Sequence, residues 1–174
     1  VSVPLYPLLT ADNILQIANH SESVACFVGK LDDIGLLGGV PEGMTIITLP
    51  LAPEAVAKRA TTDWDTIVAT TEPLAGSPVR HGGDLATLVY TSGTTGTAKG
   101  AMHSFDTLAA GLLTVVAHSD YTPEDRALSY LPLAHIMERS VLELSSLYFG
   151  YQVFFAESLT SFAARVMGGL TALA

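Results

Sequence analysis

The chain has 174 residues, of which 49% are hydrophobic and only 14% are charged, against about 25% charged in a typical soluble domain. Its net charge of −9, from 17 acidic and 8 basic residues, argues against a nucleic-acid-binding surface, which needs a basic face. So few charged side chains can cover only a small part of the surface. We therefore expect the rest of a longer chain or an oligomer partner to cover apolar surface. The opening "VSVPLYP" and the closing "GGLTALA" also favour a piece of a longer protein.

The single cysteine, Cys26, excludes an internal disulfide and a cysteine metal cluster. It lies in the apolar run "VACFVG", where a small buried thiol is the simplest interpretation, and a reducing, cytoplasmic setting suits it. The longest apolar stretch, residues 108–117, is shorter than the roughly 20 residues of a membrane span. A peripheral contact with a membrane surface stays open.

Short helices and strands alternate in the first half of the chain. Thr10 can cap a helix that runs to about Asn19, with Ile14, Leu15 and Ala18 on one face. A buried strand is predicted at residues 24–29, a brief helical turn at 32–39 that glycines interrupt, and a β-branched strand at 44–49.

Two more short helices are predicted before the middle of the chain. Pro53 can open a helix that runs to about Arg59. The segment "TDWDTIVAT" predicts another, with Trp64, Ile67 and Val68 facing inward.

After a loop at residues 72–83, the alternation continues to residue 156. The predicted elements are a strand at 85–91, a Thr/Gly loop, a helix at 104–118, a strand at 126–133, a helix at 136–149 and a strand at 151–156. This order predicts an α/β fold with a mostly parallel sheet flanked by helices. Ligands of such sheets bind at the carboxyl ends of the strands, and the Thr/Gly loop leaves one such end.

The Thr/Gly loop belongs to the stretch "LVYTSGTTGTAKG", residues 88–100. Backbone N–H groups of a glycine-rich turn can converge on phosphate oxygens, and we expect the helix that follows to add its positive end. Hydroxyl groups can wrap a chain of phosphates, and one lysine can reach a terminal phosphate. The candidate phosphate-binding residues are Thr91, Ser92, Gly93, Thr94, Thr95, Gly96 and Lys99.

Two common phosphate-binding motifs do not match this stretch. A P-loop ends on Gly-Lys-Ser/Thr, whereas Lys99 here follows Ala98 and precedes Gly100. The dinucleotide fingerprint Gly-x-Gly-x-x-Gly is absent from the chain. On composition alone, a flexible surface loop remains an alternative because Ser, Thr and Gly are common in loops.

His135 is the second candidate site residue, since it follows Pro132 at a predicted strand-to-helix junction. The alternative is a structural histidine. Glu138 and Arg139 either orient their neighbours or lie on a solvated helix turn. The remaining histidines share no metal-ligand spacing, so we expect no metal site; these are His20, His81 and His118 as isolated residues, with His103 just after the loop.

Two stretches resemble a known family. "YTSGTTGTAKG" resembles the phosphate-binding signature of the adenylate-forming ligases, which include acyl-CoA synthetases, luciferases and peptide-synthetase adenylation domains. Ala98 stands where that signature usually has proline, which should loosen the turn without removing a ligand. "SYLPLAHIMER", residues 129–139, is similar to a segment of the long-chain fatty acyl-CoA synthetase branch. The resemblance covers roughly residues 1–160 and stops after Ser161.

The resemblance implies a two-step reaction and a place in a larger protein. A fatty acid carboxylate attacks the α-phosphate of Mg-ATP, and coenzyme A then displaces AMP from the acyl-adenylate. Residues Thr91–Gly96 and Lys99 would hold the β- and γ-phosphates, and His135 would lie in the acyl and nucleotide pocket. Residues 1–174 would be part of the large N-terminal domain of such a ligase, without its C-terminal domain.

Several parts of the implied enzyme are absent from this sequence. It has no Tyr-Gly-x-Thr-Glu segment, whose glutamate would hold Mg²⁺, and no adenylation lysine of a C-terminal domain. We therefore expect the parent protein to be an acid–thiol ligase and this piece alone to be inactive. The alternatives are a non-catalytic phosphate-binding or interaction module, another adenylate-forming enzyme (an aryl-CoA ligase or a peptide-synthetase adenylation domain), and a Walker-type NTPase, which the spacing disfavours.

Overall fold

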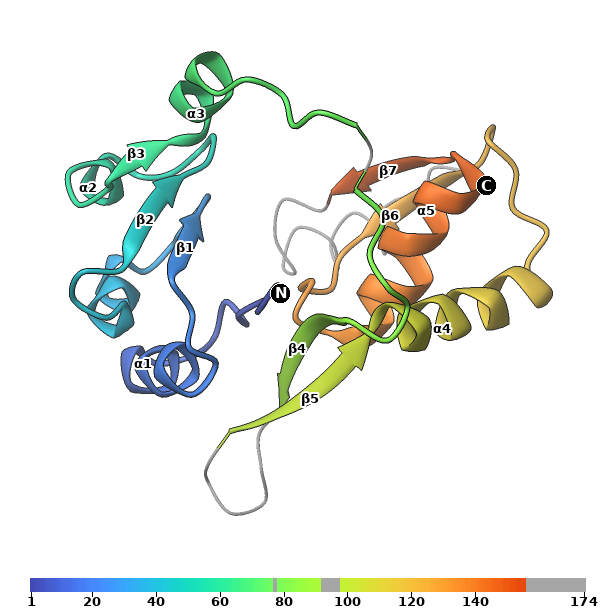
Figure 1. Ribbon diagram of the computed structural model, residues 1–174, viewed down its shortest axis with the longest axis horizontal. Coiled ribbons are helices and arrows are strands. Elements are labelled where there is room, and N and C mark those ends of the chain that lie inside the picture. Colours follow the sequence, from blue (N-terminus) through green and yellow to red (C-terminus); the bar gives the residue numbers. More distant parts are fainter. Residues whose placement is uncertain (77, 92–97, 156–174) are drawn as a thin grey trace, which may run out of the picture.

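The computed structural model describes residues 1–76, 78–91 and 98–155. Within them the strands form three small sheets, of which two are parallel and one is antiparallel. Figure 1 shows the first sheet and its helices on one side, the third sheet and its helices on the other, and a hairpin that projects below both. The predicted α/β architecture with mostly parallel pairing is confirmed.

The first sheet has the order β1-β2-β3, and all its pairs are parallel. Short helices connect these strands, and the buried side chains between them form a small core of Val28, Leu37, Val40, Ile46 and Val56. The elements are α1 (Ala11–His20), β1 (Ala25–Val28), η1 (Ile34–Gly39), β2 (Thr45–Thr48), α2 (Glu54–Ala57), β3 (Thr62–Asp63) and α3 (Trp64–Thr70).

Helix α1 begins as predicted, because Thr10 and Asn13 form a reciprocal capping box. Its buried face differs from the prediction in one residue. Ile14, Ile17 and Ala18 are buried, whereas Leu15 is 39% exposed. The pattern i, i+3, i+4 therefore begins at Ile14 and leaves Leu15 to one side of the apolar stripe.

Two predictions of burial in this region are wrong. Residues 24–29 do contain a strand, but Val24 is 82% and Phe27 54% exposed, and only Val28 of β1 is buried. Helix α3 forms where predicted, but none of its residues is buried, and Trp64 and Val68 do not face inward. The ring of Trp64 instead packs edge-on against the exposed ring of Phe27.

The second sheet is a hairpin of β4 (Leu85–Thr91) and β5 (Lys99–Ser104). Strand β4 matches the predicted strand, and the helix predicted at 104–118 is confirmed, but the expectation that its positive end adds to the Thr/Gly loop is wrong. The chain returns alongside β4 as an antiparallel strand, and α4 (Phe105–Ala117) begins only at the far end of β5. The positive, N-terminal end of α4 therefore lies away from the loop. Ser104 caps this end, as expected for a helix predicted at 104–118.

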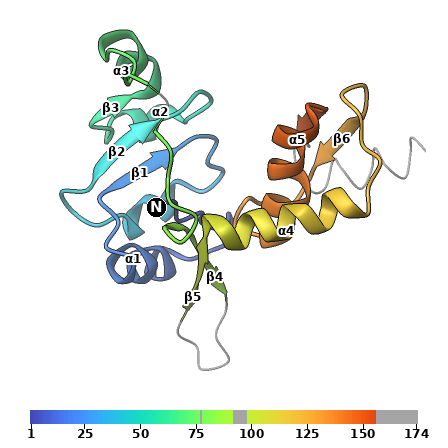
Figure 2. The same ribbon diagram turned by 45° about the vertical axis from the view of Figure 1, so that its right-hand side comes forward.

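The third sheet pairs β6 (Arg126–Ser129) with β7 (Gln152–Phe155) in parallel. They are connected through η2 (Glu138–Glu143), which is a π-helix, and α5 (Leu144–Phe149). The predicted helix at 136–149 is thus confirmed, with wide π turns in its middle. Figure 2 shows α4 extending from the hairpin to the β6 and α5 region. No helix among the described residues is long and apolar enough to cross a membrane.

The open side of this third region is strongly apolar. Helix α4 has no buried residue although it carries a single charged side chain, Asp106. Leu113, Leu147 and Phe155 are 60%, 78% and 77% exposed. So much exposed apolar surface is unusual for an isolated domain.

Candidate functional site

The hairpin places two of the predicted phosphate-binding residues opposite each other. Thr91, the last residue of β4, pairs in register with Lys99, the first residue of β5. Directly paired residues project from the same face of an antiparallel sheet, so the Thr91 hydroxyl and the Lys99 ammonium share one side of the hairpin, and both residues are exposed. The predicted residues Ser92, Gly93, Thr94, Thr95 and Gly96 lie outside the described residues.

The start of the chain fixes the position of β4. The Ser2 N–H donates to the Ala86 carbonyl at 3.1 Å, and the Leu88 N–H donates to the Ser2 carbonyl at 3.0 Å. The Thr87 hydroxyl, which is fully buried, donates to the same Ser2 carbonyl at 2.9 Å. This parallel bridge makes the N-terminal segment a neighbour of β4 and holds the strand that delivers Thr91.

His135 lies on a turn between β6 and η2, as predicted. Its backbone N–H donates to the Pro132 carbonyl at 2.8 Å, and its ring Nδ1 accepts the Met137 N–H at 3.2 Å. Because Nδ1 is an acceptor, a neutral ring carries its proton on Nε2. The half-buried imidazole can therefore donate one hydrogen bond to a ligand through Nε2–H.

A buried polar pair closes the turn that carries His135. The Ser129 hydroxyl at the end of β6 donates to the Glu138 carboxylate at 2.5 Å, and both residues are buried, at 7% and 5% exposure. The Arg139 side chain donates from Nε to the Leu133 carbonyl at 3.2 Å. Glu138 and Arg139 thus orient their neighbours, and the solvated helix turn is excluded for Glu138.

A second group of buried hydrogen bonds joins η2, α5 and the residue before β7. Ser145 is fully buried; its hydroxyl contacts the Tyr151 hydroxyl at 2.5 Å and donates to the Val141 carbonyl. Burial raises the pKa of the Tyr151 phenol, partly offset by the hydrogen bond to Ser145. The hydroxyl of Tyr151 therefore stays protonated and can donate in this network.

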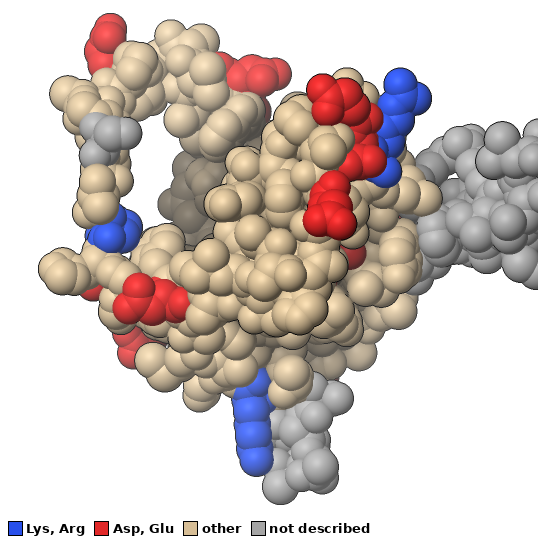
Figure 3. All heavy atoms as spheres, turned by 90° about the vertical axis from the view of Figure 1, so that its right-hand side faces the viewer, with Lys and Arg blue, Asp and Glu red and all other residues tan. Residues whose placement is uncertain are grey.

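Charged side chains are few on the surface of the molecule. Figure 3 shows a few acidic side chains and even fewer, widely separated basic ones on the face it presents. Among residues 1–76, 78–91 and 98–155, no three His, Cys, Asp or Glu side chains are grouped to hold a metal ion. The described residues therefore offer no ligand set that could hold a metal ion by protein side chains alone.

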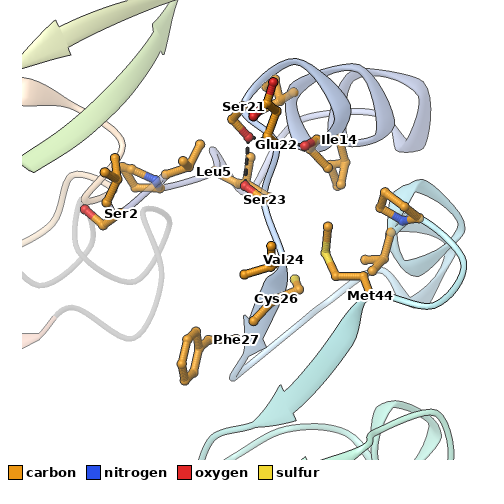
Figure 4. Close-up of a pocket in the computed structure, with 18 of the residues that line it drawn as sticks. Ser2, Leu5, Ile14, Ser21, Glu22, Ser23, Val24, Cys26, Phe27 and Met44 are labelled. Atoms are coloured by element: carbon orange, nitrogen blue, oxygen red, sulfur yellow. Dashed lines mark hydrogen bonds between the residues drawn. The ribbon is translucent and has the colours of Figure 1, made fainter. Parts of the chain in front are cut away.

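A cavity of about 990 Å³ lies elsewhere, between the N-terminal segment, α1 and β1. Figure 4 shows Leu5, Val24, Cys26 and Met44 lining it. Thr91, Lys99 and His135 do not line it, but Arg139, from the turn that carries His135, does. Burial raises the pKa of the Cys26 thiol, which keeps it protonated and poorly nucleophilic.

One contact near the hairpin was not predicted from the sequence. His20, which looked isolated, contacts Tyr90 of β4, which lies 70 positions further along the chain. Local sequence carries no signal for such a pair, because it depends on how α1 and the hairpin pack.

The chain matches a known protein family over almost its whole length. The model of the family described as AMP-binding enzyme matches residues 1–172. Curated relatives include fatty acyl-CoA synthetase A of Dictyostelium discoideum, 34% identical over 91% of this chain and 25% of the relative. Another is the peroxisomal long chain acyl-CoA synthetase 7 of Arabidopsis thaliana, 33% identical over 80% of this chain and 21% of the relative. The human long-chain-fatty-acid–CoA ligase 1 is 33% identical over 81% of this chain and 23% of the relative.

Solved structures agree on the fold. MbtA of Mycobacterium smegmatis superposes with a TM-score of 0.74 at 19% identity, covering 97% of this chain and 32% of that one. A putative long-chain-fatty-acid CoA ligase of Rhodopseudomonas palustris has a TM-score of 0.67 at 20% identity, covering 90% and 38%. The o-succinylbenzoate CoA synthetase of Bacillus subtilis has a TM-score of 0.61 at 22% identity, covering 98% and 40%. The present chain spans about a quarter of the length of the curated relatives it matches.

Proposed function

The chain belongs to the family of AMP-binding enzymes, and from this premise we propose that it is part of a long-chain fatty acid–CoA ligase. Three relatives at 33–34% identity carry fatty acyl-CoA synthetase or ligase names. Residues 1–174 would supply part of the N-terminal domain, and the chain alone would be inactive. The glutamate for Mg²⁺ and the adenylation lysine would come from the remainder of the protein.

The proposed reaction has two balanced steps. A carboxylate oxygen of the fatty acid attacks the α-phosphorus of ATP, a P–O bond breaks, and pyrophosphate leaves. The sulfur of coenzyme A then attacks the acyl carbon, the acyl–phosphate bond breaks, AMP leaves, and the thiol proton is released. The substrates of the parent protein are therefore a fatty acid, ATP and coenzyme A.

The hairpin supports the assignment of a phosphate site, and its Thr91–Lys99 pair is the observation that carries the proposal. We assign Thr91, Ser92, Gly93, Thr94, Thr95, Gly96 and Lys99 to the β- and γ-phosphates. A hydroxyl and an ammonium on one face suit a chain of phosphates, and such donors stabilise the charge that develops on leaving pyrophosphate. Mg²⁺ would neutralise phosphate charge when bound, but the described residues give it no ligand set.

His135 is assigned to the acyl and nucleotide pocket. Its Nε2–H, selected by the Met137 hydrogen bond on Nδ1, is a neutral donor that can orient the incoming carboxylate. A neutral donor positions the carboxylate without neutralising the charge that makes it a nucleophile.

The setting of the parent protein is part of the same proposal. We assign it to the cytoplasm or the surface of a membrane, where fatty acids are accessible. The exposed apolar side chains of α4, α5 and β7 form a surface that the remainder of the protein or a second copy would cover.

The proposal is tested by acid-dependent exchange of pyrophosphate into ATP, measured on the full-length protein. We expect exchange with long-chain fatty acids and weaker exchange with aryl acids or amino acids. Lys99→Ala should reduce exchange by about 100-fold, as loss of a charge-stabilising donor does. Lys58→Ala is the matched control, because Lys58 is an exposed lysine that pairs with Glu54 of α2.

Each other outcome identifies an alternative. Exchange that requires an aryl acid or an amino acid would indicate another adenylate-forming enzyme. ATP binding without exchange, unchanged by Lys99→Ala, would indicate a non-catalytic module. ATP hydrolysis to ADP would indicate an NTPase.

A further inference from the structure

Tyr90 directly precedes Thr91, at the loop end of the hairpin, and its side chain contacts neighbouring elements. Its side chain is only 5% exposed, and its hydroxyl is 2.6 Å from Nδ1 of His20, the last residue of α1. The two rings meet edge to face, with centroids 5.8 Å apart and planes at 86°. His20 itself is exposed, so it covers the outer side of an otherwise buried phenol.

Tyr90 also contacts the opposite strand of the hairpin. It pairs in register with Gly100, and a Cβ atom placed on Gly100 would lie 3.0 Å from Cζ of the Tyr90 ring. The ring therefore packs on the bare backbone of β5, in space that any side chain at position 100 would occupy. One residue thus contacts both strands and α1, immediately before the Thr91–Lys99 pair.

Strand geometry separates this contact from the proposed phosphate ligands. Successive residues of a strand project from opposite faces, so Tyr90 and Gly100 face away from Thr91 and Lys99. The contact with α1 can therefore hold the end of the hairpin without obstructing the face that a phosphate would approach. Burial raises the pKa of the Tyr90 phenol, partly offset by a hydrogen bond with the Ser21 side chain, so the hydroxyl remains a neutral donor.

We propose that His20 is a positioning residue for the phosphate site, acting through its hydrogen bond to Tyr90. The bond holds the last pair of the hairpin, Thr91 and Lys99, in the arrangement that binds ATP. The residue pair next to the loop of a hairpin separates readily because it has few neighbouring residues. If a site is correctly formed in only a fraction of the molecules, its apparent affinity for the ligand is reduced by that fraction. This inference rests on the proposed function, because it assigns ATP to the Thr91–Lys99 face.

A buried tyrosine hydroxyl finds a hydrogen-bond partner in most folds, so the test must separate positioning from packing. Tyr90→Phe keeps the ring against Gly100 and removes only the hydroxyl. His20→Ala removes the partner, and His20→Asn restores an acceptor near the place of Nδ1. Tyr148→Phe, at an exposed tyrosine of α5, is the matched control.

The experiment measures pyrophosphate exchange and thermal unfolding of the full-length protein, with Mg-ATP and the fatty acid varied separately. Tyr90→Phe and His20→Ala should each raise KM for ATP by about three- to tenfold, which is the weight of one neutral hydrogen bond. KM for the fatty acid should stay unchanged. The double variant should be no worse than Tyr90→Phe alone, because that variant already removes the bond to His20. His20→Asn should return KM for ATP to within about twofold of wild type.

Three results would overturn the inference. KM for ATP could stay unchanged in both single variants. The effects of the two variants could add in full. Both KM values could stay unchanged while kcat falls with the unfolding temperature, which would indicate a purely structural role. A wild-type protein that neither binds Mg-ATP nor exchanges pyrophosphate would reject the proposed function as well, so the two failures are distinguishable.

Discussion

The hairpin end and the turn that carries His135 both present polar residues at a change of chain direction, but different forces hold them. At the hairpin, Thr91 and Lys99 are exposed, and the contact behind them joins the Tyr90 hydroxyl to the His20 ring. At the turn, a buried carboxylate, Glu138, accepts the Ser129 hydroxyl. Burying a carboxylate is costly unless it is hydrogen-bonded. Stability should therefore depend strongly on the turn and weakly on the residues at the tip of the hairpin.

The largest expected effect comes from removing the carboxylate of the turn. Glu138→Ala leaves the buried Ser129 hydroxyl without its acceptor and creates a cavity. It should lower the free energy of unfolding by about 2–4 kcal/mol, measured by denaturant titration of the full-length protein. Glu124→Ala, at an exposed glutamate in the loop before β6, should change it by less than about 0.5 kcal/mol. Equal effects of both variants would show that the buried carboxylate of Glu138 contributes no more to stability than an exposed one.

A second prediction tests packing at the hairpin. Gly100→Ala places a methyl group 3.0 Å from Cζ of Tyr90, and the ring is buried and hydrogen-bonded. Crowding should cost about 1–3 kcal/mol of unfolding free energy and should also raise KM for ATP. Gly83→Ala is the control, because no atom lies within 4 Å of the added methyl group. A Gly100→Ala protein as stable as wild type would show that the Tyr90 ring can move.

The third prediction separates the two regions by their kinetics. His135→Ala removes the Nε2–H donor and should lower kcat/KM for the fatty acid by about tenfold, with KM for ATP little changed. Substitutions of Tyr90 and His20 should instead raise KM for ATP and leave KM for the fatty acid unchanged. The measurement is pyrophosphate exchange at varied acid and at varied ATP. If His135→Ala raised KM for ATP alone, His135 would belong to the phosphate site.

The smallest expected effect is a gain in stability near the turn. Gly111 lies inside α4, and an added Cβ would meet Ser140 Oγ of η2 at 3.6 Å, an ordinary contact. Gly111→Ala should raise the free energy of unfolding by about 0.5–1 kcal/mol through helix propensity. Thermal unfolding checks the gain, and KM for ATP should not change. A loss of stability would mean that α4 and η2 pack more tightly than the structure indicates.

Local chemistry predicted much of this fold. Thr10 and Ser104 marked helix starts because capping depends on a few adjacent residues. The apolar run at 85–91 predicted β4 for the same local reason. The turn at His135 also followed from nearby residues, because Pro132 ends the strand-like run before it.

Features that depend on distant partners were not predicted. The segment "KGAMHS" has no apolar alternation, and β5 forms because β4 lies beside it. The inward faces expected for Trp64 and Val68 are exposed because burial depends on what covers a helix. The contact between His20 and Tyr90 joins two segments far apart in the chain.

The proposed attack of a fatty acid carboxylate on the α-phosphorus of ATP can be tested in one measurement. The full-length protein is incubated with ATP and a long-chain fatty acid whose carboxyl oxygens carry a heavy isotope. Coenzyme A is then added, and the products are analysed by mass spectrometry. The account predicts that AMP carries one labelled oxygen on its phosphate and that pyrophosphate carries none. Labelled inorganic phosphate together with ADP would contradict it, because the carboxylate would then have attacked the γ-phosphorus.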